Sequence, residues 1–368
     1  MKLKVCNLYS VLFLISICIL STVNLVRYQN NAFDAVFKLN REILLKTEGL
    51  DVGQLYIMKI GSDNNLLFLD ARGCQLLQFS QNGQFLKKIG ERGQGPGEYN
   101  KPYGLAVDSQ GNIIVSDLET RRMNLYDKEG SFLSSFICTG IHWVPHIICV
   151  NSKGQYFLGG YKMDPEKMKT GNGMFINKYD SNGKYITSFY PRNTNQTWLL
   201  SIFPFFYFDL DEEDKIYATQ LNKYEISIYD SGGTLLETIG KSPSHFKPLD
   251  SSIEVDYSKF KNPSELKEKL AELSRSWTKI LSIRAIGNRY LLIELETNNL
   301  ITGNDMKYAL DILNKKGQLI AGGIQTDFRL LCTDKEGYVY FLMYTDEEEV
   351  IEKAPQYKIG KFSLKIEH

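Results

Sequence analysis

A glycine-rich stretch is the first place where this sequence could support chemistry. Residues 91–97 read ERGQGPG, and Gly93, Gly95 and Gly97 occupy every second position. Glycine-rich loops cradle phosphates when a helix follows at once and, in the Walker form, when the loop ends in Gly-Lys-Ser/Thr. Neither condition holds, because a strand-like run that begins at Pro102 follows the loop. The stretch is therefore expected to connect two strands.

Residues that could bind a metal are sparse. The chain has four histidines, and only His142 and His146 lie close together, in the segment IHWVPH, where Pro145 disfavours a helix. The acidic run at 209–214 could offer carboxylates to Ca²⁺, but its pattern is typical of a solvated hairpin turn. The cysteines form no CxxC pair, and no Ser-His-Asp triad is legible. No catalytic residue, metal ligand or cofactor is assigned; Ca²⁺ is conceivable but unsupported.

Short strand-like runs separated by turn residues surround the glycine-rich stretch. LAVD, IIVSD, MNLYD and SFLSSF follow it, with SQGN, ETRR and KEG between them, a pattern typical of a four-stranded antiparallel meander. The same parts occur 47 residues upstream. Asp70, Phe79, Gly83 and Phe85 there correspond to Asp117, Tyr126, Gly130 and Phe132.

Further copies continue to the C-terminus and make six units of about 40–50 residues, a period that predicts a β-propeller. The sixth unit has only three strands, and the run FDAVFKLNREILL at 33–45 would supply the fourth and close the ring. The expected fold is thus all-β: a six-bladed β-propeller of four-stranded antiparallel blades, with the last blade closed by an N-terminal strand.

One insertion, at about 241–281, separates the fourth and fifth units. Leu266, Leu270, Leu273 and Trp277 fall at helical spacing within it, and Asn262 or Ser264 can cap the helix. This apolar stripe is expected to pack on the flank or face of the propeller. The alternative is a lid or a docking element for a partner.

The second unit, GQGPGEYNKPYGLAVDSQGNIIVSDLETRRMNLYDKEGSFL, resembles an NHL repeat. The whole chain resembles the six-bladed propeller proteins of bacterial cell envelopes, especially those of Bacteroidota. This resemblance implies a propeller fold and an envelope location. It leaves activity open, because some NHL-type propellers are metal-dependent lyases with channel histidines and others are scaffolds.

Five residues align at one position just before the inner strand of their unit, where a ring would bring them to a common axial mouth. An aromatic-rich mouth with one histidine and one arginine could stack a sugar or clamp a carboxylate. The alternative is that the aromatic residues plug the channel and pack blade against blade. The five residues are Tyr56, Tyr103, His146, Phe206 and Arg329.

The first 30 residues predict a membrane anchor or a signal segment, separate from a propeller domain at 31–368. Lys2 and Lys4 precede a run at 8–26 that carries no charge, about the length of a membrane-spanning helix. No A-x-A cleavage pattern follows, so an uncut inner-membrane anchor is favoured over cleavage and secretion. Lys2 and Lys4 should stay in the cytoplasm, which places the propeller outside it.

The charge balance argues against one class of partner. The chain has 43 basic and 43 acidic residues, so no basic surface for nucleic acid is expected. We therefore expect a binding or interaction module in the cell envelope, whose partner is a small molecule, a glycan or a protein. The alternative is a metal-dependent lyase or hydrolase with an axial active site, which the scarcity of histidine disfavours.

Overall fold

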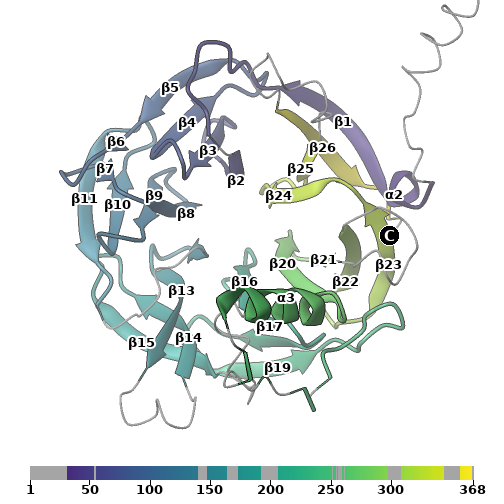
Figure 1. Cartoon of the computed structure of the whole chain (residues 1–368). Helices are drawn as coiled ribbons and strands as arrows, with labels where there is room; N and C mark the ends of the chain where they lie inside the picture. Colours follow the sequence, from purple (N-terminus) through teal and green to yellow (C-terminus); the bar gives the residue numbers. More distant parts are fainter. Residues whose placement is uncertain are drawn as a thin grey trace, which may run out of the picture.

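The structure, a computed structural model, is a ring of six four-stranded antiparallel sheets (Figure 1). It describes residues 31–53, 55–139, 147–163, 173–191, 206–250, 252–253, 255, 259–260, 262–296, 308–343 and 357–366. This architecture confirms the six-bladed propeller that the repeat predicts. In each blade the first strand faces the centre of the ring and the fourth faces outward.

The first three blades follow one another along the chain. Blade 1 contains β2 (Leu55–Ile60), β3 (Leu66–Asp70), β4 (Gln75–Phe79) and β5 (Phe85–Ile89). Blade 2 contains β8 (Pro102–Val107), β9 (Ile113–Asp117), β10 (Arg122–Tyr126) and β11 (Phe132–Ile137). Blade 3 contains β12 (Ile148–Val150), β13 (Tyr156–Met163), β14 (Gly173–Tyr179) and β15 (Tyr185–Pro191).

The last three blades complete the ring. Blade 4 contains β16 (Phe206–Leu210), β17 (Ile216–Gln220), β18 (Ile226–Tyr229) and β19 (Leu235–Ile239). Blade 5 contains β20 (Lys279–Ile286), β21 (Tyr290–Glu296), β22 (Tyr308–Asn314) and β23 (Leu319–Thr326). Blade 6 contains β24 (Arg329–Thr333), β25 (Val339–Met343), β26 (Lys358–Leu364) and the N-terminal β1 (Phe37–Leu44).

The ring is closed by β1, which pairs antiparallel with β26 from Phe37 opposite Leu364 to Leu44 opposite Lys358. The short helix α2 (Asn31–Val36) precedes β1. Its Phe33 ring stacks on Phe37 with the centroids 4.6 Å apart and contacts Phe341 edge-on. This confirms that the N-terminal strand completes the last blade, where it covers the edge of β26 and joins the two ends of the repeat into a closed ring.

Blades pack face to face, which explains why their middle strands are apolar on both sides. All five residues of β3, of β9 and of β17 are buried. Ile226 and Ile228 of blade 4, for example, share one buried cluster with Leu291 and Ile293 of blade 5. A single four-stranded meander could not bury both of its faces, whereas the ring buries each face against a neighbour.

The glycine-rich stretch forms the connection between blades 1 and 2. Within it, β6 (Glu91–Arg92) runs parallel to β7 (Glu98–Tyr99). The carboxylate of Glu98 accepts the backbone N–H of Gly95 at 2.7 Å, and the hydroxyl of Tyr126 donates to the carbonyl of Gly97 at 2.9 Å. In a phosphate loop, backbone N–H groups of this kind would bind the phosphate. Here the N–H of Gly95 is bound by the side chain of Glu98, which belongs to the same loop. The strand β8 follows, as predicted.

The insertion carries the predicted helix, α3 (Pro263–Ser274). Asn262 caps it, because its side-chain oxygen accepts the N–H of Glu265 at 3.0 Å while its amide donates to the Glu265 carboxylate at 3.1 Å. Leu270 and Leu273 pack against the buried cluster of blades 3 and 4, together with Trp277. The helix therefore lies on the face where the inner strands begin (Figure 1).

Within the described part of the chain, no helix is long and apolar enough to cross a bilayer. Residues 1–30, which carry the predicted anchor or signal, lie outside that part. The division of the chain at about residue 30 stays a prediction.

Candidate functional site

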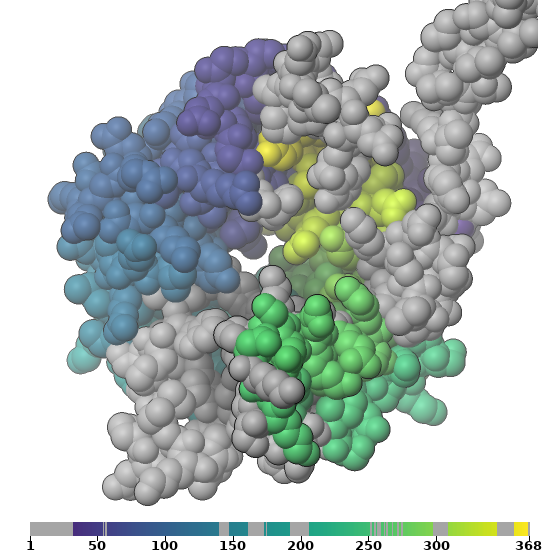
Figure 2. All heavy atoms as spheres, viewed as in Figure 1, coloured from purple at the N-terminus to yellow at the C-terminus, as the bar shows by residue number. Residues whose placement is uncertain are grey.

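The centre of the ring holds a cavity of about 390 Å³, to which all six inner strands contribute. A space-filling view shows an opening there (Figure 2). A second space of about 430 Å³ lies toward the turns that follow the inner strands, and it shares Lys59, Ile148, Cys149 and Asp209 with the first. We call the two together the axial cavity. Its polar lining toward the start of the strands comprises Lys59, Tyr103, Tyr207, Asp209, Ser282, Arg284, Glu294 and Arg329.

One register position recurs in all six inner strands and carries three charges. Each residue at this position lies opposite a residue near the start of the next strand in its blade. The six are Lys59, Ala106, Cys149, Asp209, Arg284 and Cys332, which pair with Leu67, Ile114, Phe157, Tyr217, Leu292 and Tyr340. Lys59 and Asp209 are the single charged residues of β2 and β16, and Arg284 is one of two in β20, beside Lys279; the register brings all three to one level of the ring.

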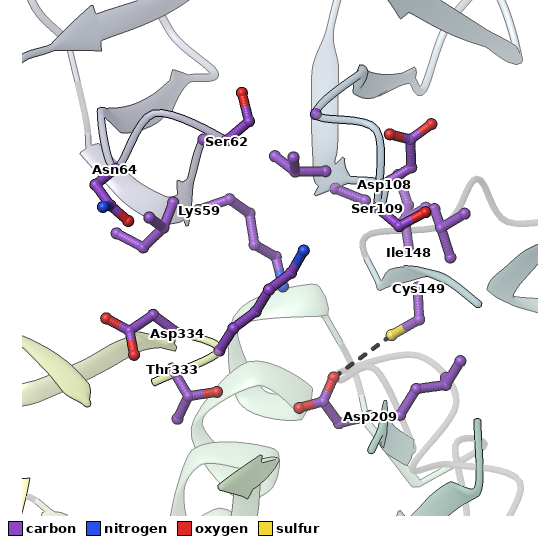
Figure 3. A pocket seen from close by; sticks show the side chains of 18 of the residues that line it. Lys59, Ser62, Asn64, Asp108, Ser109, Ile148, Cys149, Asp209, Thr333 and Asp334 are labelled. Atoms are coloured by element: carbon purple, nitrogen blue, oxygen red, sulfur yellow. Dashed lines mark hydrogen bonds between the residues drawn. The ribbon is translucent and has the colours of Figure 1, made fainter. Parts of the chain in front are cut away.

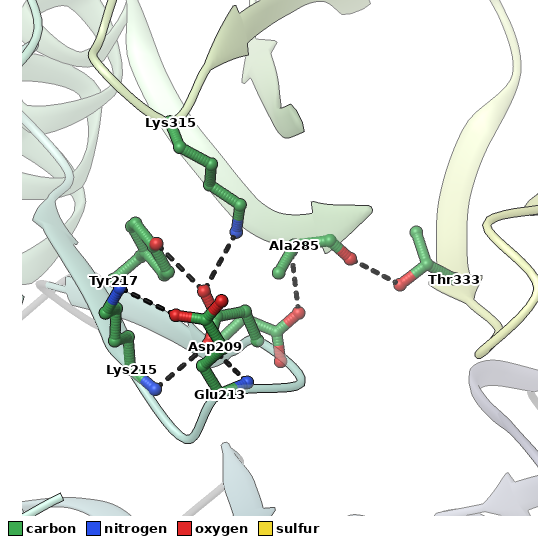
Figure 4. A network of polar contacts seen from close by, with 8 residues as sticks. Asp209, Glu213, Lys215, Tyr217, Ala285, Lys315 and Thr333 are labelled. Carbon is green, nitrogen blue, oxygen red and sulfur yellow. Dashed lines mark hydrogen bonds and ion pairs between the residues drawn. The ribbon is translucent and has the colours of Figure 1, made fainter. Parts of the chain in front are cut away.

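Asp209 joins neighbouring blades at this level. Its Oδ2 accepts the backbone N–H of Ala285 at 3.0 Å, and its Oδ1 lies 3.6 Å from the thiol of Cys149 (Figures 3 and 4). Burial raises the pKa of the Cys149 thiol, so the sulfur remains protonated and can donate to the carboxylate. The negative charge of Asp209 is thus held by groups of the protein itself.

Two cations in the axial cavity have no carboxylate partner within the described residues. The side chain of Lys59 points into the cavity (Figure 3), and no hydrogen bond or ion pair of its ammonium group is found there. Arg284 donates from Nη1 to its neighbour, the Ile283 carbonyl, at 2.9 Å, while its buried Nε has no hydrogen-bond partner. Both side chains are half-buried, and partly desolvated cations of this kind favour an anion close by.

The third cation, Arg329, is accommodated by the protein. Glu294, which is 1% exposed, accepts the backbone N–H of Leu330 at 2.9 Å and the hydroxyl of Ser282 at 3.2 Å. Burial raises the pKa of Glu294, and the charges of Arg329 and, to a smaller extent, Arg284 oppose this rise. The guanidinium of Arg329 also lies 5.8 Å from the centre of the Tyr308 ring. Three cations thus face two carboxylates around the cavity toward the start of the strands.

Of the five residues predicted for the axial mouth, two line the axial cavity, one is buried between blades, and the side chains of two are not described. Tyr103 and Arg329 both line the axial cavity. Phe206 is buried in the cluster of blades 3 and 4, where its ring stacks on Phe175 with the centroids 4.4 Å apart; the next residue, Tyr207, lines the cavity instead. Tyr56 belongs to β2, and its side chain is not described; His146 lies outside the described residues.

Lys59, Asp209 and Arg284 were not predicted as site residues. Asp209 was assigned to an acidic hairpin turn, yet it is part of β16, and the turn begins at Asp211. The signal that would have found all three is a charged residue at the same position of a mainly apolar inner strand. The Asp211 carboxylate holds the turn, because it accepts the N–H groups of Glu213 and Lys215 at 3.0 Å each and the hydroxyl of Tyr217 at 2.9 Å (Figure 4).

The other cysteines are buried thiols, and the metal candidates His142 and His146 lie outside the described residues. Cys74, Cys138 and Cys332 are buried thiols like Cys149, and burial raises the pKa of each. Within the described residues, no group of three or more His, Cys, Asp or Glu side chains is placed to hold a metal ion.

The fold and the cavity define a class: a six-bladed β-propeller whose inner strands enclose a charged axial cavity. A family model described as 6-bladed beta-propeller (DUF5128) matches residues 19–351. The chain belongs to this family.

Curated relatives match short parts of the chain and support the resemblance to NHL repeats. Human NHL repeat-containing protein 3 is 32% identical over 87 residues, which are 23% of this chain and 23% of that protein. Protein lin-41 of Caenorhabditis elegans is 36% identical over 63 residues, 17% of this chain and 5% of that protein. The chain thus spans well under two thirds of these relatives.

Solved structures share the fold over most of the chain. The "Putative exported protein" of Bacteroides fragilis superposes with a TM-score of 0.60 at 13% identity, covering 90% of this chain and 96% of that one. A member of the duf4221 family from Bacteroides vulgatus superposes with a TM-score of 0.61 at 14% identity, covering 90% of this chain and 99% of that one. Virginiamycin B lyase from Staphylococcus aureus superposes with a TM-score of 0.50 at 12% identity, covering 86% of this chain and 82% of that one. At these identities the likeness concerns the fold alone.

Proposed function

We propose that this chain is a ligand-binding propeller of the bacterial cell envelope, and that its axial cavity binds a small ligand through a carboxylate. The observation that carries the proposal is the pair Lys59 and Arg284. Both lie at one level of the cavity, and neither has a carboxylate partner within the described residues. An incoming carboxylate would supply the missing acceptor.

The chemistry of the two cations favours a carboxylate over a neutral polar group. A guanidinium offers several N–H donors in a fixed plane that matches the two oxygens of a carboxylate, and a lysine ammonium adds a point charge. Within the described residues, neither Asp209 nor Glu294 forms an ion pair with Lys59 or Arg284; each carboxylate accepts a backbone N–H group. Toward the start of the strands, the cations of the lining outnumber the carboxylates by one when Glu294 is ionised and by two when it is protonated; toward the turns, Asp108, Asp334 and Glu336 outnumber Lys335.

The rest of the lining suits a ligand that also has a carbon skeleton. Leu105, Leu281 and Leu331 contribute apolar walls, while Tyr103 and Tyr207 add aromatic rings. Mostly apolar walls with a few placed polar groups are typical of pockets for small molecules. Sugar acids, dicarboxylates and short peptides with a free C-terminus are therefore the classes to try first.

The envelope location rests on the N-terminal segment and on the resemblance to envelope propellers. The apolar run at 8–26 has the length of a membrane-spanning helix and follows two lysines. Fractionation of the full chain would test this part: the protein should accompany the membrane, and a chain without residues 1–30 should remain in the cytoplasm. Recovery of the full chain in the cytoplasm would contradict the proposed location.

A thermal-shift screen of residues 31–368 tests ligand binding. The panel comprises sugar acids, dicarboxylates and short peptides, each beside its amide. A carboxylate at 100 times its dissociation constant should stabilise the protein by about 2.7 kcal/mol, and its amide should not. Lys59→Gln should weaken the shift, whereas Lys38→Gln, a change on the exposed strand β1, should leave it unchanged. No shift with any acid, or shifts that need a divalent ion and vanish with EDTA, would contradict the proposal.

A further inference from the structure

Lys59, Asp209 and Arg284 lie at one level of the axial cavity, which therefore presents two cations and one carboxylate together. The thiol of Cys332, at the same level in blade 6, is influenced by all three charges. Burial raises its pKa to about 12, and the charges of Lys59 and Arg284 oppose this rise. The carboxylates of Asp334 and Asp209 add to it. The three charged groups of this level thus surround one space.

The carboxylate of Asp209 has room for a further donor. An ionised carboxylate has about four acceptor sites. Within the described residues, Asp209 accepts two donors, the N–H of Ala285 at 3.0 Å and the thiol of Cys149 at 3.6 Å. The ammonium group of Lys315 pairs with Asp211 instead, at 3.4 Å (Figure 4). Asp209 lines both spaces of the axial cavity, so a bound molecule can reach its oxygens (Figure 3).

The two ends of the axial cavity differ in polarity. Toward the turns the lining is polar and mainly acidic, with Ser62, Asn64, Asp108, Ser109, Asp334, Lys335 and Glu336. Toward the start of the strands it has apolar and aromatic walls, made by Leu105, Leu281, Leu331, Tyr103 and Tyr207. The space there, about 390 Å³, is near the lower end of the range of about 300–1,000 Å³ for small-molecule pockets. A compact ligand with one apolar end fits this space.

We propose that the ligand of the axial cavity is a free α-amino acid with an apolar side chain. Its carboxylate would bind between Lys59 and Arg284, and its ammonium group would donate to Asp209. Its side chain would lie against the leucines and tyrosines toward the start of the strands. The inference rests on the proposed function, because the carboxylate binds the same two cations.

Sugar acids and dicarboxylates fit the axial cavity less well. Neither class carries a cation for Asp209. A second carboxylate that extended toward the turns would also meet the acidic lining there, and like charges brought together weaken binding. A zwitterion instead matches both signs of charge at the level of Lys59, Asp209 and Arg284.

Calorimetric titration of residues 31–368, which contain all six blades, tests the role of the ammonium group. Leucine is compared with 4-methylpentanoate, and phenylalanine with 3-phenylpropanoate, since each acid lacks only the amino group. Each amino acid should bind wild type at least about 10-fold more tightly than its acid, because its ammonium group adds a charge-assisted hydrogen bond. Leucinamide and phenylalaninamide, which lack the carboxylate, should bind at least about 10-fold more weakly than the amino acids.

Asp209→Asn tests where the ammonium group binds. In this variant the preference for the amino acid over its acid should disappear, while binding of the acid shows that the cavity is still formed. Glu237→Gln, which removes an exposed negative charge from β19, should keep the preference of wild type. A preference that persists in Asp209→Asn, or loss of both ligands by a variant that circular dichroism shows to be folded, would overturn the role of Asp209.

The titration of wild type decides the inference even where a variant does not fold. If the acids bind and the amino acids bind no more tightly, the amino-acid inference is wrong and the proposed function stands. If neither the acids nor the amino acids bind, while another carboxylate stabilises the protein, the inference is again wrong and the proposed function stands. If no carboxylate binds, both are wrong.

Discussion

The carboxylate of Asp209, at the axial end of blade 4, accepts the backbone N–H of Ala285 in blade 5 over 3.0 Å. The carbonyl of Ala285 in turn accepts the hydroxyl of Thr333 in blade 6 at 3.2 Å (Figure 4). This chain of hydrogen bonds fixes three neighbouring inner strands at one level of the ring. Within the described residues no ion pair joins Asp209 to Lys59 or Arg284, and we propose that a ligand supplies the anionic partner of these two cations.

Replacing Asp209 should separate its structural role from its electrostatic one. Asp209→Ala removes the acceptor of a buried N–H and should lower the free energy of unfolding by about 1–3 kcal/mol. Asp209→Asn keeps a carbonyl oxygen and should cost less, while the loss of a negative charge should strengthen binding of carboxylates. Urea unfolding and calorimetric titration measure the two effects. Equal destabilisation by both changes would contradict the assigned hydrogen bond.

Two turn glycines differ in what surrounds them, although both have positive φ angles. An added Cβ at Gly183 would lie 2.2 Å from the Phe136 ring, whereas at Gly154 the nearest atom, in Ser181, would be 3.7 Å away. Gly154→Ala should therefore cost only the backbone strain, about 1–2 kcal/mol. Gly183→Ala should cost clearly more, by about 1–3 kcal/mol for the forced repacking. Similar urea midpoints would contradict this account of blade packing.

His245 should make stability depend on pH. Its Nε2 lies 2.8 Å from the buried carboxylate of Asp311, to which Tyr224 also donates at 2.7 Å. The hydrogen bond with Asp311 raises the pKa of His245 above its ordinary 6.5. Its contribution is therefore fully present below pH 6.5 and is lost as the pH rises through the folded-state pKa.

The matching experiment compares wild type with His245→Gln. The substitution should lower the free energy of unfolding by about 1–2 kcal/mol at pH 6, because it removes a hydrogen bond to a charged partner, and by less at pH 9. Urea unfolding at both values measures the difference. A loss that is constant across this range would show that the charge on His245 contributes nothing.

Asp117 should be among the most sensitive residues of blade 2. Its two oxygens accept the backbone N–H groups of Asn100, Lys101, Glu119 and Thr120 at 2.6–3.0 Å. Asp117→Ala leaves these donors without their acceptor and should destabilise the protein by about 3 kcal/mol or more. Glu119→Ala, a change of a neighbouring acidic residue, is the control for loss of charge. A cost below about 1 kcal/mol would contradict the role of Asp117.

The fold could be predicted from the sequence because the residues that form the turns recur at the same positions of successive repeats. Gly83 and Gly130 both adopt positive φ angles in the turn between the third and fourth strands of their blades, and Asp70 and Asp117, each at the end of the second strand, both bind backbone N–H groups. These roles depend on residues close by in the chain, within or just before the same blade. They repeat with the blade and can be aligned without a structure.

The site was predicted less well, because the direction of a side chain near the axis depends on the adjacent blades. Tyr103 and Phe206 align in sequence, yet Tyr103 lines the cavity while Phe206 stacks on Phe175 of the preceding blade. The cavity charges at Lys59, Asp209 and Arg284 differ from blade to blade, so a search for repeated residues passes over them. Their common position in the strand pairing of each blade shows that the three residues lie at one level of the axial cavity.

Arg284 is the residue through which we propose that the axial cavity binds a carboxylate. Calorimetric titration with the acid that gives the largest thermal shift tests it most directly, in wild type, Arg284→Gln and Lys38→Gln. Loss of a charge-assisted hydrogen bond should raise the dissociation constant about 10-fold or more in Arg284→Gln and leave Lys38→Gln unchanged. An unchanged affinity in Arg284→Gln, or equal binding of the corresponding amide by wild type, would contradict the account.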